Sequence, residues 1–229
     1  MTPRHRVTVA VDGPAGSGKG SVCRAAAERF GLAYLDTGSL YRAVGLLALR
    51  HGLEAPAALA AAASTMSFAF RPVAPGDYRA FLEGEDVSRT LREEQVGMAA
   101  SRVAAIPEVR AALLTFQRGY GGSNDAILDG RDVGTVILPD ASLKIFLEAS
   151  PQARAERRAL ELQGAGKAVS FHTIHARMSE RDARDRGRND APLTPAADAI
   201  LIDTTHMTLA ESVRQVVRLV ENVLRRTAP

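Results

Sequence analysis

The sequence predicts an α/β fold in which helices cover both faces of a central parallel sheet. Short apolar runs typical of buried strands alternate along the chain with longer segments of helical periodicity. This alternation is typical of β-α-β units, whose strands run parallel. Between about residues 65 and 88, short strand-like pieces instead follow one another between proline and glycine residues. We expect a small antiparallel insert there.

Two strand–helix units precede the insert. An apolar run leads into a glycine-rich stretch, and the periodic segment after it stops at Gly31, a residue type that commonly ends helices. Asp36, Thr37 and Ser39 can cap the helix that follows the second strand. The expected strands are residues 7–11 and 34–35, and the expected helices are residues 19–30, 40–50 and 57–63.

Helices and single strands alternate again after the insert. The periodic segment 90–120 is broken at Pro107, which favours the start of a new helix, and Gly121-Gly122 are expected to end that helix. Residues 164–167 are expected to form a mobile tip. Further strands are expected at residues 126–128, 143–147 and 199–202, and further helices at residues 151–163, 171–186 and 209–226.

Composition indicates an ordinary globular protein with anionic partners. The 229 residues suffice for one large domain or two small ones, and 46% of them are hydrophobic and 24% charged. A net charge of +3 and an isoelectric point near 9.3 are too weakly basic to indicate nucleic acid. Only Lys19, Lys144 and Lys167 are lysines, so most of the basic charge is arginine, which binds phosphate in a bidentate way.

The chain carries no sign of secretion or of a membrane partner. Cys23 is the only cysteine, so no intrachain disulfide can form, and its place in the first helix indicates a core residue. The apolar run that follows Arg4 and Arg6 is too short for a signal peptide or a membrane-spanning helix. We therefore expect a cytoplasmic protein.

Residues 12–21 have the pattern of a phosphate-binding loop. Glycines there let successive backbone N–H groups point at phosphate oxygens, and a lysine at the start of the next helix supplies a full charge. The usual hydroxyl after the lysine is replaced by glycine and comes one position later. A turn that binds nothing is the alternative, but a strand before it and a helix after it favour the loop. The residues are Asp12, Gly13, Pro14, Ala15, Gly16, Ser17, Gly18, Lys19, Gly20 and Ser21.

Polar residues also follow the second strand and the strand at 126–128. Because ligands of open α/β sheets bind at the carboxyl ends of strands, we expect these residues to face the same crevice as Lys19. Asp129 then orients water on magnesium, and Arg131 clamps a transferring phosphate. The alternatives are helix capping for Asp36 and Thr37, and an exposed turn with local ion pairs for residues 129–135.

Residues 180–188 are densely charged with both signs. Arg181, either Arg184 or Asp185, and Arg188 recur at helical spacing and share one face. From the residues alone, a solvated helix with ion pairs is the favoured interpretation. The cluster of Arg154, Arg157 and Arg158 is interpreted in the same way. His172 and His175 lack partners at metal-ligand spacing, so they are interpreted as surface or lid residues, and no residue is assigned as a metal ligand.

Taken together, these segments resemble the bacterial cytidylate kinase family. The resemblance runs in order over nearly the whole chain, and its most specific parts are Leu-Glu-Gly-Glu-Asp-Val-Ser at 82–88 and Asp-Gly-Arg-Asp-Val-Gly-Thr at 129–135. Other matching segments are residues 12–21, 36–42, 100–110, 144–147, 180–188 and 192–199. The resemblance implies a single domain, residues 1–229, with the three-layer P-loop kinase fold. It also implies a monophosphate-binding insert at about 65–88 and a helical lid at about 154–188.

The resemblance further implies ATP- and Mg²⁺-dependent phosphorylation of CMP and dCMP by a monomer, and roles for individual residues. Gly13 to Ser21 and Arg157 would hold ATP. Lys19, Asp129, Arg131 and Arg188 would be catalytic, which reverses the solvated interpretation of 180–188. The acceptor would be bound by Thr37, Tyr41, Arg42, Ser101, Arg110, Arg131, Asp132, Arg181, Asp185 and Arg188.

Two other functions are weighed against this one. A P-loop kinase for a different acceptor, such as UMP, AMP or shikimate, is disfavoured by the insert and by the set Ser101, Arg110 and Asp132. A P-loop switch or nucleic-acid-binding ATPase is disfavoured because clear guanine-reading or helicase motifs are missing and the basic residues are spread along the chain.

Overall fold

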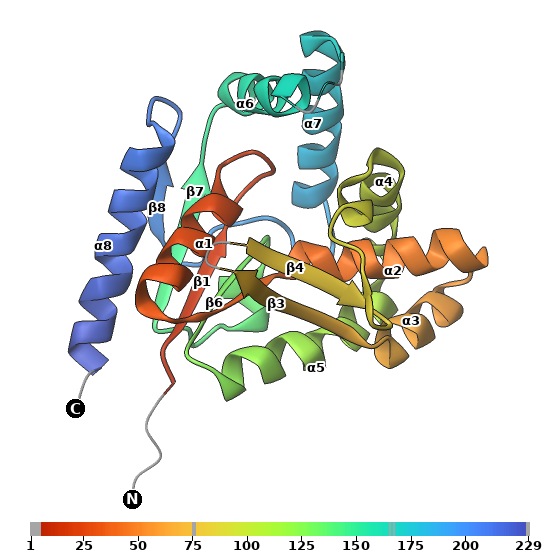
Figure 1. Ribbon diagram of the computed structural model, residues 1–229, viewed down its shortest axis with the longest axis horizontal. Coiled ribbons are helices and arrows are strands. Elements are labelled where there is room, and N and C mark those ends of the chain that lie inside the picture. Colours follow the sequence, from red (N-terminus) through yellow and green to blue (C-terminus); the bar gives the residue numbers. More distant parts are fainter. Residues whose placement is uncertain (1–5, 75–76, 165, 167, 228–229) are drawn as a thin grey trace, which may run out of the picture.

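A parallel sheet forms the centre of the molecule. The computed structural model describes residues 6–74, 77–164, 166 and 168–227. Within them, five parallel strands are arranged in the order β2-β6-β1-β7-β8 (Figure 1). The strands are β1 (Thr8–Asp12), β2 (Ala33–Asp36), β6 (Ala126–Gly130), β7 (Leu143–Glu148) and β8 (Ile200–Asp203).

Helices cover both faces of this sheet, which confirms the predicted three-layer fold. On one face lie α1 (Lys19–Phe30) and α8 (Leu209–Thr227). On the other lie α2 (Thr37–His51) and α5 (Pro107–Ser123), with α3 (Pro56–Thr65) against α5 and α4 (Glu94–Val103) against α2. Because neighbouring strand residues point to opposite faces, Val9 and Val11 join the α1–α8 core while Ala10 joins the other core.

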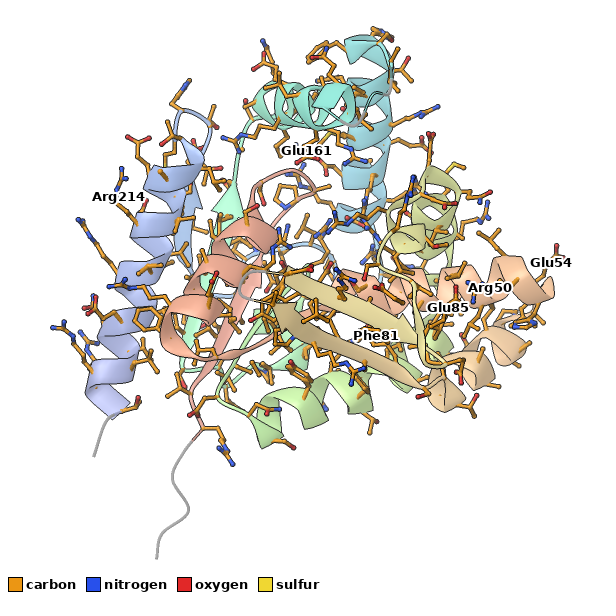
Figure 2. The ribbon with its side chains drawn as sticks, in the orientation of Figure 1. Arg50, Glu54, Phe81, Glu85, Glu161 and Arg214 are labelled. Carbon is orange, nitrogen blue, oxygen red and sulfur yellow. The ribbon has the colours of Figure 1, made fainter. Side chains whose placement is uncertain are left out.

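A second, antiparallel sheet lies where the insert was expected. It consists of β3 (Phe68–Ala74), β4 (Asp77–Leu82) and β5 (Glu85–Asp86), whereas Pro75 and Gly76 lie outside the described residues. Arg50 of α2 donates hydrogen bonds to both carboxylate oxygens of Glu85 at 2.8 and 2.9 Å (Figure 2). Phe70 and Tyr78 pack edge-on against Tyr34 of β2. The small sheet is thus attached to the central sheet and to α2.

Two packed helices, α6 (Pro151–Gly164) and α7 (Phe171–Arg186), stand over the glycine-rich loop that follows β1 (Figure 1). A buried arginine joins the three elements. Arg154 of α6 pairs with Asp182 of α7 at 2.7 Å and donates to the carbonyl oxygen of Ala15 at 3.1 Å. Residues 165 and 167 of the expected mobile tip lie outside the described residues.

The helix boundaries that differ from the prediction include the start of α2 and the end of α5. Helix α2 begins at Thr37 rather than at residue 40, because Asp36 is already its N-cap residue, and the Asp36 carboxylate accepts the hydroxyl of Ser39 instead of a backbone N–H. Helix α5 continues through Gly121 and Gly122 to Ser123. A Cβ on Gly121 would come within 2.9 Å of the Leu138 side chain, so this glycine permits close packing rather than ending the helix.

Two short turns complete the chain: a 3₁₀ turn, η1 (Thr90–Arg92), and a π-helical turn, η2 (Val133–Ile137), which the sequence did not predict. Cys23 is fully buried, as expected. None of the helices in the described ranges is both long and apolar enough to cross a membrane.

The contact between α2 and α4 requires a glycine. A Cβ on Gly45 would lie 2.8 Å from the backbone nitrogen of Ala100 and 3.1 Å from the carbonyl carbon of Ala99. We expect Gly45→Ala to lower the free energy of unfolding by about 1–3 kcal/mol, because two backbones must separate. The matched control is Gly97→Ala on α4, where nothing lies within 4 Å. It should raise the free energy of unfolding by about 0.5 kcal/mol through helix propensity. Equal effects in urea unfolding would contradict this account.

Candidate active site

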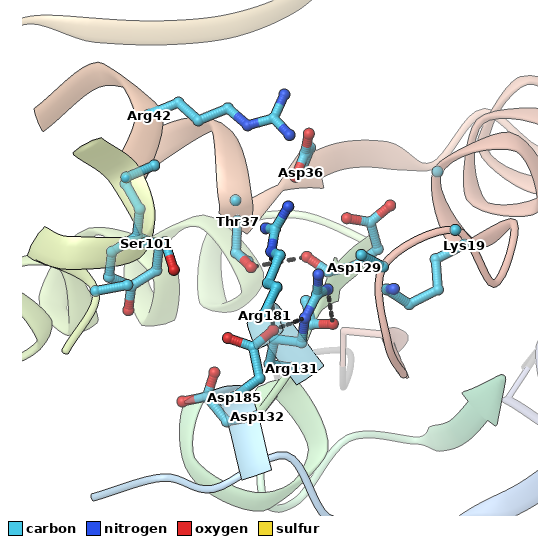
Figure 3. A pocket seen from close by; sticks show the side chains of 18 of the residues that line it. Lys19, Asp36, Thr37, Arg42, Ser101, Asp129, Arg131, Asp132, Arg181 and Asp185 are labelled. Atoms are coloured by element: carbon cyan, nitrogen blue, oxygen red, sulfur yellow. Dashed lines mark hydrogen bonds and ion pairs between the residues drawn. The ribbon is translucent and has the colours of Figure 1, made fainter. Parts of the chain in front are cut away.

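The register of the central sheet brings three chain turns to one place. Asp12 lies opposite Gly130, and Asp36 lies opposite Asp129. The segments after β1, β2 and β6 therefore meet at the carboxyl edge of the sheet, where α/β proteins bind ligands. A pocket of about 310 Å³ opens there (Figure 3). The glycine-rich loop, the start of α2, residues 100–110, the turn after β6 and the end of α7 line it.

The glycine-rich loop has the backbone that a phosphate site needs. Gly13 has φ of 146°, and a Cβ there would lie 2.1 Å from the carbonyl oxygen of Leu147. Gly18, with φ of 93°, is the N-cap residue of α1, so the helix N-terminus opens directly into the pocket. The Lys19 ammonium donates to the carbonyl oxygens of Gly13 at 2.7 Å and Pro14 at 2.8 Å. Burial, together with the positive charge of Arg131, lowers the pKa of Lys19.

A buried carboxylate connects this loop to the turn after β6. Asp12 accepts the backbone N–H groups of Val133 and Gly134, both at 2.8 Å. Its burial raises the pKa of the Asp12 carboxyl to about 6, although these two hydrogen bonds and Lys19 act in the opposite direction. Asp12 was not selected as a site residue from the sequence, although it stands at the junction of the buried strand and the phosphate-loop pattern.

Asp129 is held between β2 and the start of α2. Its side-chain Oδ2 accepts the Tyr34 hydroxyl at 2.9 Å, and its backbone oxygen accepts the Thr37 hydroxyl at 2.8 Å. Burial and the negative charge of Asp36 raise the pKa of Asp129. A Cβ on Gly20 would lie 3.4 Å from Asp129 Oδ2. This is an ordinary van der Waals distance, so the space around Gly20 does not by itself require a glycine.

Four arginines gather on the side of the pocket that faces α7. Arg131 pairs with Asp185 at 2.9 Å, Arg188 pairs with the same carboxylate, and Arg181 lies 4.0 Å from it (Figure 3). Burial and the charges of Arg131, Arg42 and Arg188 lower the pKa of Arg181 to about 10, although Asp185 opposes this shift. The group carries more positive charge than its one shared carboxylate neutralises, as expected of a site that receives an anion.

A donor–acceptor pair stands at the other end of the pocket. Arg110 of α5 donates to Asp132, and both side chains are buried. Burial raises the pKa of Asp132, although Arg110 opposes this. The Arg110 guanidinium also lies 5.8 Å from the centre of the Tyr41 ring. The buried hydroxyl of Ser101 has no hydrogen-bond partner among the described residues, although it lines the same pocket.

Most of the residues predicted from the sequence line this one pocket. They are Ala15, Gly16, Gly18, Lys19, Gly20, Ser21, Thr37, Tyr41, Arg42, Ser101, Arg110, Asp129, Arg131, Asp132, Arg181, Asp185 and Arg188. Gly13, Pro14 and Ser17 lie beneath the loop surface. Arg157 points elsewhere and donates to the hydroxyl and carbonyl oxygens of Thr204, in the segment after β8.

The lining residues that were not proposed from the sequence include Arg24, Tyr34 and Glu161. Arg24 and Glu161 lie on helices that the sequence marks as ordinary amphipathic elements. The solvated interpretation of residues 180–188 is wrong for Asp182 and Asp185, which are buried, and the exposed-turn alternative is wrong for Asp129 and Asp132. Partners from distant segments bury these carboxylates, so local charge density gave no signal.

The sequence matches a known protein family over nearly its whole length. The model of a family described as cytidylate kinase matches residues 9–222. The chain belongs to the cytidylate kinase family. It is 57% identical to a cytidylate kinase of Magnetococcus marinus, over 97% of this chain and 99% of the relative. It is 47% identical to a cytidylate kinase of Vibrio cholerae, over 96% of this chain and 98% of the relative.

A solved structure shares the fold at much lower sequence similarity. The crystal structure of an uncharacterized protein from Eubacterium ventriosum aligns with a TM-score of 0.52 and 13% identity, over 94% of this chain and 99% of that one. This likeness concerns the fold alone. The family assignment rests on the sequence matches.

The shared carboxylate of Asp185 offers a test of the arginine cluster. We expect Asp185→Asn to lower the free energy of unfolding by about 3 kcal/mol near neutral pH, because buried arginines lose their counter-charge. Burial alone would raise the pKa of Asp185, but Arg131, Arg188 and Arg181 outweigh it and hold the pKa below its ordinary value of 3.8. Folding therefore gains from the ionised form above that value, and the gain is lost as the pH falls through the folded-state pKa.

Urea unfolding at several pH values measures this difference. The stability advantage of the wild type over Asp185→Asn should shrink as the pH falls below about 4. Asp198→Asn serves as the control, because Asp198 is exposed and pairs with Lys144. An advantage that grows towards acid pH would contradict the ion-pair account.

Proposed function

We propose that this chain transfers the γ-phosphoryl group of ATP to CMP and dCMP. One observation carries the proposal: a phosphate loop faces an arginine cluster and a donor–acceptor pair within one pocket of a cytidylate kinase family member. The loop suits the donor phosphates, the cluster suits the acceptor phosphate, and the pair suits the acceptor base. Each of these assignments is argued below from the contacts around it.

The acceptor phosphate is proposed to bind among Arg42, Arg131, Arg181 and Arg188. Guanidinium forks form bidentate hydrogen bonds with phosphate. Burial and the neighbouring arginines lower the pKa of Arg181, and a phosphate dianion at this place would relieve the repulsion among the arginines. Arg42 reaches towards the pocket while its NH1 donates to the carbonyl oxygen of Leu91 at 3.3 Å. Thr37 lies at the same edge and is proposed to contact the acceptor through its hydroxyl.

The acceptor base is proposed to be read by Arg110, Asp132 and Ser101. Cytosine presents an acceptor at N3 and a donor at its 4-amino group, whereas uracil presents a donor at N3 and an acceptor at O4. An arginine beside an aspartate therefore matches cytosine and opposes uracil. Buried polar groups left unpaired make such discrimination strong. The unpartnered Ser101 hydroxyl supports a ligand at this end of the pocket.

Residues 13–21 are proposed to hold ATP. Arg157 of α6 donates to Thr204 in this structure and would have to leave that residue to contribute to ATP binding. Asp36 and Asp129 fit a magnesium ion that accompanies the nucleotide, because Mg²⁺ is usually held by one or two carboxylates, water and phosphates. Burial and the charge of Asp36 raise the pKa of Asp129, and a cation between the two carboxylates would relieve their repulsion. Bound magnesium would neutralise charge that develops on the transferring group. Ser21 supplies a hydroxyl at the same edge of the pocket.

The catalytic chemistry is proposed to be positioning and charge neutralisation. A phosphate acceptor is a competent nucleophile at neutral pH, so the pocket needs no dedicated base. Lys19 would leave its two carbonyl partners and follow the donor phosphates, while Arg131 and Arg188 would stabilise the charge that spreads over the transferring group. Asp129 would orient water molecules bound to the magnesium ion.

The segments about residues 65–88 and 154–188 are proposed to be the monophosphate-binding insert and the lid. The lid segment contributes Glu161, Arg181, Asp185 and Arg188 to the pocket. The insert segment reaches the pocket indirectly, through the packing of Phe70 and Tyr78 on Tyr34. Their closure would exclude water and so suppress hydrolysis of ATP.

The protein is proposed to act as a cytoplasmic monomer. The donor loop, the arginine cluster and the base-reading pair all come from one chain, so a second copy is not needed to complete the pocket. The buried free thiol of Cys23 suits a reducing compartment.

The proposal is tested by ADP release with ATP and Mg²⁺ against CMP, dCMP, UMP, AMP and GMP. The highest kcat/KM is expected with CMP and dCMP. A preference for another monophosphate would overturn the base-reading assignment. The proposed phosphoryl transfer from ATP would still hold. Absence of turnover with every acceptor would overturn the kinase proposal.

Removal of either proposed charge-stabilising group should affect the chemical step. We expect Lys19→Ala and Arg131→Ala each to lower kcat with CMP by about a hundredfold or more, because each removes a cation from the transferring group. Arg225→Ala is the control, since Arg225 is exposed on α8 and pairs with Glu221. Near-normal kcat in a folded Lys19 or Arg131 variant would refute the role of that residue.

Loss of the base-reading carboxylate should relax specificity. We expect Asp132→Ala to lower the ratio of kcat/KM for CMP over UMP by about tenfold or more, because the acceptor for the 4-amino group is gone. The ratio is compared with that of Asp198→Ala, which alters an exposed carboxylate. An unchanged ratio would exclude Asp132 from base recognition.

A further inference from the structure

The segment after α7, residues 187–193, folds back onto the pocket. The Leu193 N–H donates to the carbonyl oxygen of Asp185 at 2.8 Å, and the Leu193 side chain is buried. Between them, Ala191 is buried with φ of 50°, a left-handed conformation that alanine rarely adopts. The hydrogen bond and the buried side chain of Leu193, together with the left-handed turn at Ala191, therefore fix the course of the backbone in this segment.

This path places Asp190 against Arg110. Oδ2 of Asp190 lies 3.3 Å from Nε of Arg110. The two partners differ in exposure, since the Asp190 side chain is 61% exposed and the Arg110 side chain only 8%. The exposed carboxylate thus approaches the buried guanidinium from the solvent side.

Three groups together surround the Arg110 guanidinium. Asp132 accepts from its NH2, the Tyr41 ring lies 5.8 Å from its centre, and Asp190 faces its Nε. They come from the turn after β6, from α2 and from the segment after α7. Asp132 restrains the guanidinium by a hydrogen bond, whereas Asp190 acts on it through an ion pair, because Nε has no hydrogen-bond partner among the described residues. The three contacts lie on different parts of the planar group and together restrain its orientation.

Space for an alternative orientation exists beside this arginine. A second cavity of about 590 Å³ adjoins Arg110 and is lined by Ala104 and Pro107 on one side and by Ala183 and Asp190 on the other. Without Asp190, the guanidinium can turn towards this cavity or bind both oxygens of Asp132. Either movement removes a donor or an acceptor from the base-reading pair.

We infer that Asp190 is a positioning residue that orients Arg110 for the selection of cytosine. The inference rests on the proposed function, in which Arg110 and Asp132 read the base. Asp190 acts through Arg110 and does not touch the reacting phosphates. Its loss should therefore change acceptor binding and specificity while phosphoryl transfer at saturation and ATP binding stay intact.

The first test is the kinetics of Asp190→Asn with CMP and UMP. An exposed carboxylate contributes little to folding, so the variant should fold as the wild type does. We expect the ratio of kcat/KM for CMP over UMP to fall about fivefold through a higher KM for CMP, as for loss of one partly exposed ion pair. The kcat at saturating CMP and the KM for ATP should stay within twofold. Asp198→Asn is the matched control, because it also removes an exposed acid that pairs with one cation.

The second test separates positioning from a general effect of charge. In an Arg110→Lys background, Nε is absent, so adding Asp190→Asn should leave the CMP/UMP ratio unchanged. An equal fall of the ratio in both backgrounds would overturn the inference. So would an unchanged ratio in the single variant, or a KM for ATP that rises as much as that for CMP.

The outcomes also distinguish this inference from the proposed function. If the wild type does not phosphorylate CMP, or does not prefer it to UMP, the proposed function fails, and this inference fails with it. If the wild type prefers CMP and Asp190→Asn keeps the full preference, only the role of Asp190 is overturned.

Discussion

The buried carboxylate of Asp185 organises the cationic half of the pocket. It lies near the end of α7 and pairs with Arg131 from the turn after β6 and with Arg188 from the segment beyond α7. Its backbone oxygen also receives Leu193, so the same residue directs the chain that carries Asp190. Removing one partner of a buried ion pair leaves an uncompensated charge, which strongly destabilises the fold. The ion pairs of Asp185 therefore hold α7 against the turn at the carboxyl edge of the sheet.

A second carboxylate organises the opposite half. Asp12 ends β1 and binds two N–H groups of the turn after β6, so the phosphate loop and the turn that carries Arg131 form one unit. The backbone of Gly13 passes so close to Leu147 that no side chain fits there. The positions of Lys19 and Arg131 therefore follow from contacts made beneath the pocket.

Charge in this pocket is arranged for a ligand rather than for folding. Burial and neighbouring cations lower the pKa values of Lys19 and Arg181, and burial with a neighbouring carboxylate raises that of Asp129. Bound phosphates would reduce the repulsion among the cationic groups, and the proposed magnesium ion would reduce the repulsion between the carboxylates. Groups already oriented need no reorganisation during phosphoryl transfer, which is the physical basis of electrostatic catalysis.

The sequence by itself determined the strands, the helices, the phosphate loop and most of the pocket residues, because these depend on local periodicity and on glycine and charge patterns. It did not reveal Asp12, Tyr34 or Asp190 as site residues, and it read residues 180–188 as solvated until the family resemblance was considered. Tertiary structure decided these points, since Asp12 is bound to residues more than a hundred positions away and Asp190 meets an arginine from α5. Burial of a charge depends on such distant partners, and no local pattern of residues records them.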